Sequence, residues 1–297
     1  MQSSRRDFLK AGVTATAIPS VLSALPLNTT KRSATDLVAL GKSNVQVTRL
    51  AFGTGTYSGR VQRELGQPEF TRLVRYAYDH GIRFFETADS YHGMPQMLSI
   101  ALKGLPRDSY KLMTKYNTRD TEDPAATISR LRSDLGAEYV DIMLLHCVRS
   151  PTWPQDDARL RDAFSEAKEK KIILSHGASV HGLPALDAFP GTTWLDVAMI
   201  RMNHKGVRMD TPSTQDTDAI GDVPQVVSQM KKMRAQGAGI ISMKLVGEGR
   251  FVQRSDRQAA LNYAFNVAGV DAVTIGYKNT AEIDEAIQNL NQALRAA

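Results

Sequence analysis

Four side chains that can hold or move a proton follow apolar runs of the sequence. Glu86 and Tyr91 lie in FFETADSYHG, directly after two aromatic residues that are typical of a buried strand. Lys115 ends the run YKLMTK, and His146 ends the run YVDIMLLH. In a barrel of parallel strands, the carboxyl ends of several strands deliver catalytic groups to one face. We therefore expect the acid, the phenol, the amine and the imidazole to share one site.

These four groups suit the reduction of a carbonyl. A free phenol has a pKa of about 10, so it is a weak acid at neutral pH. The ammonium group of Lys115 should lower the pKa of Tyr91, and the carboxylate of Glu86 should hold Lys115 in position. His146 can orient a substrate carbonyl and donate to its oxygen. The predicted reaction is carbonyl reduction, in which a cofactor supplies the hydride and Tyr91 supplies the proton.

The elements that must position these groups alternate between strand and helix. The helical runs carry apolar residues at helical spacing, for example Phe70, Leu73 and Ala77 before Gly81. The strand runs are VTRLAFGT, IRFFET, YKLMTK, YVDIMLLH, IILSHGASV, LDVAMIRMN, GIISMKL and DAVTIGY. Eight such units predict an α/β fold of the (β/α)8 TIM barrel type, with the N-terminal β-hairpin LVALGKSNVQV capping the barrel bottom. The alternative, an open doubly wound sheet, lacks the GxGxxG loop that usually follows its first strand.

The order and content of these segments resemble the aldo-keto reductase family. The matching motifs are GKSNVQVTRLAFGTG, GIRFFETADSY, LMTKYN, LRSDLGAEYVDIMLLH, GASV and GVDAVTIGYKNTAEIDEAI. The resemblance implies a barrel domain over residues 36–297 that uses NADP(H), with NAD(H) as the alternative cofactor, to reduce a small aldehyde, ketone or sugar-like carbonyl. It implies Tyr91 as proton donor, Lys115 as its activator and His146 as the residue that orients the substrate. Glu86 stands where the family has aspartate.

The resemblance also implies a set of cofactor-binding residues. In this sequence they are Ser179, Met243, Lys244, Gly276, Lys278 and Asn279. Helix-end amides and a basic side chain are expected to hold the phosphate groups of the cofactor. Val180 replaces the asparagine that usually follows Ser179, Met199 lies near an expected glutamine, and Ala286 replaces a distal asparagine.

The departures from the family pattern leave a second function open. Glu86, Val180 and Met199 each replace a residue that the family uses in its site. A barrel changed in this way fits a protein that binds a ligand or partner without turnover.

A metal-dependent barrel that acts on sugars is a third alternative. His92, His181 and His204 also follow predicted strands, and Glu86 could join them as a ligand. However, the ammonium group of Lys115 would repel a cation placed among these ligands. We therefore expect no metal.

Three further features near the strand ends have modest implications. Cys147, beside His146, is expected to be a small packing residue, because no pattern of bases supports its activation. Trp153 could wall the substrate pocket or anchor a surface loop. The GEGR run, residues 247–250, could wrap the diphosphate of the cofactor or simply turn the chain.

The N-terminal segment has the order of an export signal. Arg5 and Arg6 precede a weakly apolar, uncharged run, VTATAIPSVLSALPL. The paired arginines resemble a twin-arginine signal, so we expect residues 1–30 to be a signal peptide that engages the twin-arginine export machinery. The alternative is a basic amphipathic helix that stays on the protein, although Pro19 and Pro26 would interrupt it. The expected location of the mature protein is the periplasm or another exported compartment.

The composition of the chain limits the kinds of partner and site that we expect. The net charge of +6 is mild for 297 residues and no dense basic run is present, so nucleic acid is a poor candidate and a small carbonyl substrate is the expected partner. The single cysteine, Cys147, excludes an internal disulfide and a four-cysteine iron–sulfur site. Outside the N-terminal segment, no apolar run is long enough to predict a membrane span.

Overall fold

The structure is a computed structural model that describes residues 32–119 and 123–295. The predicted signal peptide, residues 1–30, lies outside the described residues, as do the last two residues of the predicted barrel domain. Within the described part, none of the helices combines the length and hydropathy needed to span a membrane.

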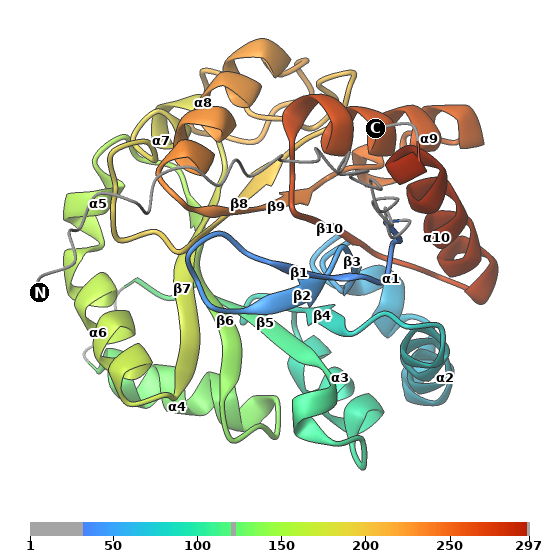
Figure 1. Ribbon diagram of the computed structural model, residues 1–297. Helices are drawn as coiled ribbons and strands as arrows, with labels where there is room; N and C mark the ends of the chain where they lie inside the picture. Colours follow the sequence, from blue (N-terminus) through green and yellow to red (C-terminus); the bar gives the residue numbers. More distant parts are fainter. Residues whose placement is uncertain (1–31, 120–122, 296–297) are drawn as a thin grey trace, which may run out of the picture. The chain divides into compact units, whose positions relative to one another are not determined.

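Eight parallel strands close into a barrel, which confirms the predicted fold (Figure 1). Around the barrel the order is β10-β3-β4-β5-β6-β7-β8-β9, so the first and last barrel strands pair, with Leu50 opposite Val273. The barrel strands are β3 Leu50–Gly53, β4 Phe84–Glu86, β5 Lys111–Tyr116, β6 Val140–Val148, β7 Ile173–Val180, β8 Val197–Arg201, β9 Gly239–Met243 and β10 Ala272–Ile275.

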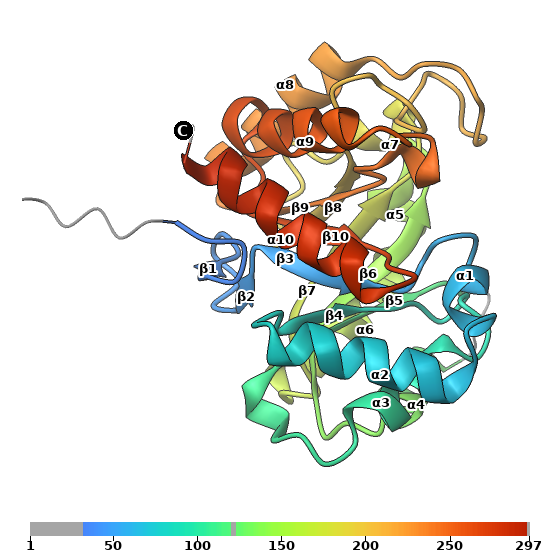
Figure 2. The same ribbon diagram turned by 90° about the vertical axis from the view of Figure 1, so that its right-hand side faces the viewer.

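A hairpin crosses the amino-terminal end of the barrel, as predicted (Figures 1 and 2). Strand β1, Leu37–Ala39, pairs antiparallel with β2, Gln46–Thr48. The side chains of Leu40, Val45 and Val47 are buried among the inward-facing residues of the barrel. Gly41 lies so close to the segment before β9 that a Cβ atom would be 2.2 Å from a backbone oxygen, so only glycine fits there. The run VTRLAFGT, which we predict as one strand, is divided at Arg49 between β2 and β3.

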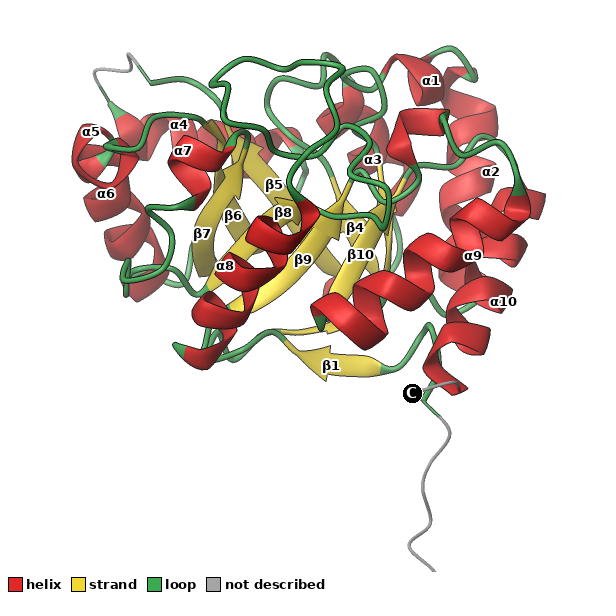
Figure 3. Cartoon of the chain, turned by 90° about the horizontal axis from the view of Figure 1, so that it is seen from above, coloured by secondary structure: helices red, strands yellow, loops and turns green. Residues whose placement is uncertain are grey.

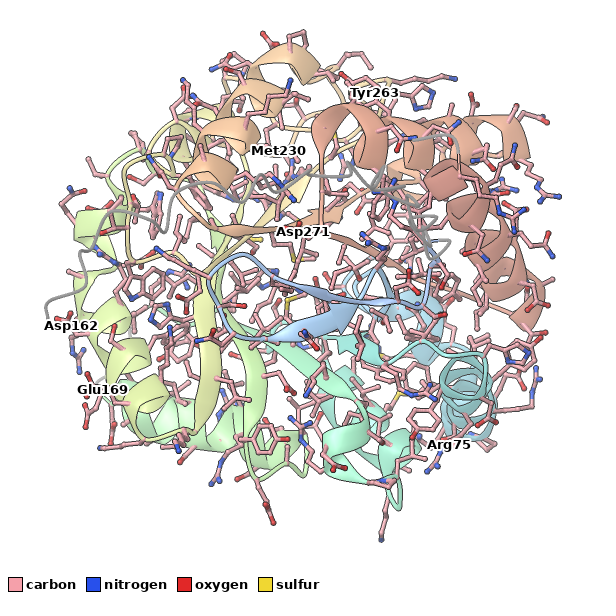
Figure 4. All side chains as sticks on the ribbon, viewed as in Figure 1. Arg75, Asp162, Glu169, Met230, Tyr263 and Asp271 are labelled. Carbon is pink, nitrogen blue, oxygen red and sulfur yellow. The ribbon has the colours of Figure 1, made fainter. Side chains whose placement is uncertain are left out.

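Helices cover the outside of the barrel. They are α1 Arg60–Arg63, α2 Gly66–Asp79, α3 Met94–Leu102, α4 Pro124–Asp134, α5 Trp153–Asp156, α6 Ala158–Glu169, α7 Leu183–Leu186, α8 Val223–Ala235, α9 Arg254–Tyr263 and α10 Thr280–Arg295, with short 3₁₀ segments at Arg107–Ser109 and Gly247–Gly249 and a π-helical segment at Ala264–Ala268. Asp123 caps α4 by accepting from the backbone N–H of Ala126 at 2.9 Å, as Asp-Pro at a helix start predicts. Figure 4 shows Asp162 and Glu169 of α6 on the outer side of the helix layer.

The alternation of side chains along the strands decides which residues enter the barrel. Phe84 of β4, Met113 of β5 and Ile142 of β6 belong to the interior cluster, whereas Phe85 and Met143 pack outward against the helices. With a period of two, the inward positions continue at residues 86, 115 and 146. The predicted acid, amine and imidazole therefore share the layer nearest the carboxyl ends, where Figure 3 shows the long loops, opposite β1.

Candidate active site

Lys115 is the centre of a buried hydrogen-bond network at the barrel mouth. Its side chain is 1% exposed, and its amine is paired with the carboxylate of Glu86. The same amine donates to the backbone oxygen of Thr87 at 3.0 Å and to the hydroxyl oxygen of Tyr91 at 3.2 Å. The acid, amine and phenol predicted from three separate segments are therefore in direct contact.

Glu86 has room for its longer side chain because of its neighbours. One carboxylate oxygen takes the Lys115 amine, and the other accepts from the hydroxyl of Thr274 at 3.2 Å. A Cβ atom on Gly53 would lie 2.4 Å from that hydroxyl and 3.1 Å from the carboxylate. The absence of a side chain at Gly53 thus makes space for a glutamate at this position.

Tyr91 stands in the wall of the site with its ring edge-on to His146. The two ring centroids are 5.6 Å apart, and a Cβ atom on Gly55 would lie 2.6 Å from the Tyr91 hydroxyl. Burial raises the pKa of Tyr91 well above its ordinary value, and the charge of Glu86 adds to this shift. The direction predicted from Lys115 alone is therefore wrong, because burial, together with the charge of Glu86, raises the pKa of the phenol. The phenol is held in its protonated form.

His146 is held by a serine that our prediction did not include. The hydroxyl of Ser90 lies 3.1 Å from Nδ1 of His146. Burial lowers the pKa of His146 well below its ordinary value, and the charge of Lys115 lowers it further. The imidazole is therefore neutral at physiological pH, and its second ring nitrogen is left for other partners.

Two cavities meet beside Tyr91. The smaller, of about 70 Å³, is lined by Tyr91 and Glu86 together with Gly53, Gly55, Met199 and Met243. The larger, of about 530 Å³, runs between the segment after β9 and the start of α10. Both are lined by Thr56, Val246, Glu248, Ile275 and Gly276. Because these residues border both cavities, the two adjoin; together they are called the groove, and its narrow end lies at the phenol.

Four of the six predicted cofactor residues line this groove. Met243, Lys244 and Gly276 line the smaller cavity, and Gly276 and Lys278 line the larger one. A Cβ atom on Gly276 would lie 2.7 Å from the hydroxyl of Thr56, so the chain presents bare backbone to the groove at this point. Lys244 is paired with the carboxylate of Glu248, in the 3₁₀ turn of the GEGR run. That run therefore both turns the chain and lines the groove.

Ser179 and Asn279 do not line either cavity. The Ser179 hydroxyl is buried and accepts from the backbone N–H of Cys147 at 3.0 Å, where the register between β6 and β7 shifts. The side-chain oxygen of Asn279 accepts from the backbone N–H of Glu282 at 3.0 Å, so it caps α10. Both side chains are engaged within the protein, and their proposed contact with a cofactor remains a prediction.

The replaced positions are spread through the barrel. Met199 lines the smaller cavity, Val180 is fully buried in the outer core, and Ala286 lines the larger cavity. The absence of larger polar side chains at residues 199 and 286 leaves both cavities with more apolar walls than the family pattern implies.

A charged cluster that our prediction missed borders His146, and its members do not line either cavity. His181 has its ring 6.4 Å from that of His146, and the guanidinium of Arg201 contacts both His181 and Asp216. Arg149 donates to Asp216 at 2.8 Å. The cluster ties the loop that carries Asp216 to the barrel mouth. Its members are far apart in the chain, so no local pattern indicates it.

The remaining candidates have structural contacts. Cys147 is partly buried, with its sulfur 3.3 Å from Nε2 of His181, and burial raises the pKa of its thiol. Trp153 is 1% exposed and packs on Phe189, with ring centroids 5.1 Å apart. Trp153 therefore anchors the segment after β6, and it does not line either cavity.

The histidines of the metal alternative are dispersed. His92 is exposed, His181 contacts Arg201, and the ring of His204 packs on Phe251 at a centroid distance of 5.4 Å. Among the described residues, no three His, Cys, Asp or Glu side chains are grouped so that they could hold a metal ion.

Parts of this chain are similar in sequence to known proteins. "Probable aldo-keto reductase 1" of Glycine max is 29% identical over 155 residues, which is 48% of this chain and 45% of that protein. L-galactose dehydrogenase of Arabidopsis thaliana is 26% identical over 238 residues, which is 74% of this chain and 68% of that protein. The chain thus spans about half the length of the first of these relatives.

A solved structure shows the same fold. The holo form of aldo-keto reductase AKR11C1 from Bacillus halodurans has a TM-score of 0.67 and 19% identity, over 88% of this chain and 96% of that chain. The sequence profile described as "Aldo/keto reductase family" matches residues 49–297. With this match spread over nearly the whole eight-stranded barrel, the chain belongs to the aldo/keto reductase family.

Proposed function

We propose that the protein is an oxidoreductase that reduces a small aldehyde, ketone or sugar-like carbonyl with a nicotinamide dinucleotide. The observation that carries this proposal is the contact chain from Glu86 through Lys115 to Tyr91, which ends at the narrow end of the groove. Membership of the family supports the reaction class, and the names of the relatives above are consistent with it.

The groove fits an elongated cofactor. Its two adjoining cavities extend from Tyr91 to the start of α10, and Gly276 exposes backbone where a Cβ atom would meet Thr56. The narrow end is walled by Met199 and Met243, which suit the flat, weakly polar ring of a nicotinamide. When bound, the cofactor supplies the hydride. The resemblance in sequence favours NADP(H) over NAD(H), and the charges of the cavity bear on that choice below.

In this proposal Tyr91 donates the proton. Its phenol carries a proton at neutral pH, and Lys115 at 3.2 Å stabilises negative charge on the oxygen as the proton leaves, which offsets the effect of burial on the pKa. Glu86 holds the Lys115 amine at one distance from the phenol. The acid therefore acts through the amine and does not need to touch the substrate.

His146 positions the carbonyl. When Ser90 donates to Nδ1, the ring carries its own proton on Nε2 and can donate it to the carbonyl oxygen. A neutral imidazole does this without competing with Tyr91 for the transferred proton, because its pKa lies well below neutrality. Two donors would then converge on one oxygen.

The test is to incubate the full chain with NADPH or NADH and a panel of small carbonyl compounds. Turnover is monitored as the loss of absorbance of the reduced cofactor. Tyr91→Phe should abolish most of the turnover while it leaves cofactor binding in place. Cofactor binding with no turnover on any carbonyl would favour the alternative of a binding barrel. Activity that a chelator removes would favour the metal-dependent alternative.

We also propose that residues 1–30 direct export by the twin-arginine pathway. The support is the order of charged and apolar residues after Arg5 and Arg6. Replacing both arginines with lysine should leave the protein in the cytoplasm when fractions of a bacterial host are compared. Unchanged export of that variant would contradict the proposal.

A further inference from the structure

The charged side chains that line the larger cavity are mostly acidic. Glu248, Glu282 and Glu285 line it, against the cations of Arg257 and Lys278. A ligand with a phosphate at this end would need a cation whose donors are free. The hydrogen bonds and ion pairs that these cations already make within the protein therefore decide which ligand the cavity accepts.

Most of the donors of Arg257 are used within the protein. Its Nε and one terminal nitrogen donate to the two carboxylate oxygens of Glu285 at 2.6 and 2.8 Å. The other terminal nitrogen donates to the backbone oxygens of Phe251 and Val252 at 2.9 and 2.8 Å. This bidentate pair braces α9 against α10, so Arg257 has few donors left for a ligand.

Lys278 and Glu282 face the cavity together at the first turn of α10. One oxygen of Glu282 accepts from the backbone N–H of Lys278 at 2.8 Å, which holds the carboxylate in place. The amine of Lys278 is 3.8 Å from the other oxygen, and its side chain is 64% exposed. Arg254, on α9 beside the cavity, donates to the side-chain oxygens of Asn289 and Gln288. Among the cations that line the cavity at this end, Lys278 is the one without a tight hydrogen bond. Its amine already lies near the carboxylate of Glu282.

Glu248, which lines both cavities, is also paired with cations of the protein. Its carboxylate takes the amine of Lys244 and accepts from Nε of Arg208 at 2.6 Å. These two cations are therefore paired before any cofactor enters. The fixed carboxylate without such a strong partner is Glu282.

We infer that this cavity selects NAD(H) over NADP(H), and that Glu282 determines the selection. The inference rests on the proposed function, because it assigns the larger cavity to the adenosine end of the cofactor. A carboxylate accepts well from the two hydroxyls of a ribose, whereas a 2′-phosphate carries a charge of about −2 and calls for arginine. The preference is the opposite of the one implied by resemblance to the family.

The experiment is isothermal titration of the full chain with NAD⁺ and NADP⁺, and with 5′-AMP and 2′,5′-ADP. The second pair differs only in the 2′-phosphate and does not need the nicotinamide end. We expect NAD⁺ to bind about tenfold more tightly than NADP⁺, and AMP more tightly than 2′,5′-ADP by a similar factor. Added salt should reduce the difference, because the lining charges are partly exposed.

The decisive variant is Glu282→Gln, which keeps the shape of the side chain and removes its charge. It should raise the affinity for NADP⁺ about fivefold or more and change that for NAD⁺ by less than about threefold. Glu169→Gln is the matched control, because Glu169 lies on the outer side of α6 (Figure 4) and has the same charge change. Circular dichroism establishes that both variants are folded.

The outcomes separate this inference from the proposed function. Equal affinity for the two cofactors, or tighter binding of NADP⁺, overturns the inference and leaves the reductase intact. An unchanged ratio in Glu282→Gln overturns the role of that residue. Tighter binding of NAD⁺ without turnover of any carbonyl supports the inference and contradicts the proposed reaction. Binding of neither dinucleotide overturns both.

Discussion

The amine of Lys115 lies 3.2 Å from the hydroxyl oxygen of Tyr91 and at the same time pairs with Glu86. The three groups come from the ends of β4 and β5 and from the loop after β4. A proton that leaves the phenol therefore leaves its charge beside a cation that is already held in place. This arrangement lowers the reorganisation needed during proton transfer.

Tyr91→Phe removes that proton donor with little change in shape. We expect kcat to fall by about 10²- to 10⁴-fold, the range for loss of a general acid, while the Kd of the cofactor changes little. The measurement is steady-state turnover together with cofactor titration. Ser109, on the outer 3₁₀ segment Arg107–Ser109, offers a control substitution to alanine far from the groove. A variant of Tyr91 that keeps its full rate would show that another group donates the proton.

Glu86→Gln leaves the buried charge of Lys115 without its partner. Breaking such a pair costs about 3–5 kcal/mol of unfolding free energy, so the variant should unfold at a clearly lower urea concentration. Glu86→Asp keeps the charge and gives up the hydrogen bond from Thr274, so it should cost about 1 kcal/mol. Its activity should equal or exceed that of the parent, because the resemblance to the family implies an aspartate at this position.

The double variant with Lys115→Met provides the control for this pair. Once the amine is absent, Glu86→Gln should cost much less than it does alone, because the uncompensated charge is gone. Equal costs in the two backgrounds would mean that the two side chains do not stabilise each other.

Gly55→Ala should disturb the phenol and spare the fold. The new Cβ atom would lie 2.6 Å from the Tyr91 hydroxyl, closer than real contacts allow, so the ring must move. We expect turnover to fall about tenfold or more and stability to fall by about 1–3 kcal/mol, the cost of overpacking. In the Tyr91→Phe background the stability cost should shrink, because the nearest atom is absent. An alanine variant with normal turnover would show that the phenol has room to shift.

Asp210 should make stability depend on pH. Burial raises its pKa from 3.8 to about 6, although the charge of Arg201 opposes the shift. A raised pKa means that the folded state favours the protonated form, so the stabilisation is fully present below the ordinary pKa of 3.8 and is lost as pH rises through 6. Asp210→Asn does not titrate, and its side-chain oxygen can still accept from the backbone N–H of Gly182.

The stability of the parent relative to this variant should therefore fall by about 2 kcal/mol between pH 4.5 and pH 8. Urea unfolding of both proteins across that range measures the difference. His181, whose pKa burial lowers to about 3, titrates in both proteins, so its contribution cancels. A constant difference across the range would show that Asp210 is ionised throughout.

The fold and the inner layer of the site could be predicted because they follow from short-range rules. The alternation of strand residues with a period of two places positions 86, 115 and 146 inside the barrel. The loop residues at the site also follow closely in sequence, as Tyr91 does after Glu86. These relationships need no knowledge of which distant segments meet.

The side-chain contacts around the site could not be predicted in the same way. Arg257 meets Glu285 because α9 packs on α10, and Arg201 meets Asp216 because a long loop folds back over the barrel mouth. The pKa of Tyr91 also depends on burial and on Glu86 together, so reasoning from Lys115 alone has the wrong sign. The two ion pairs and the pKa of Tyr91 all depend on which distant segments meet in the fold, and a pattern along the sequence does not contain that information.

The seam between β10 and β3 constrains how the polypeptide can acquire this structure. Leu50 pairs with Val273, so the sheet closes on itself only through partners near opposite ends of the chain. During synthesis, β3 cannot pair with β10 until β10 has been made. Until then, that edge of β3 remains open to incorrect association. The nascent protein should therefore depend on protection of that edge until the final strand has left the ribosome.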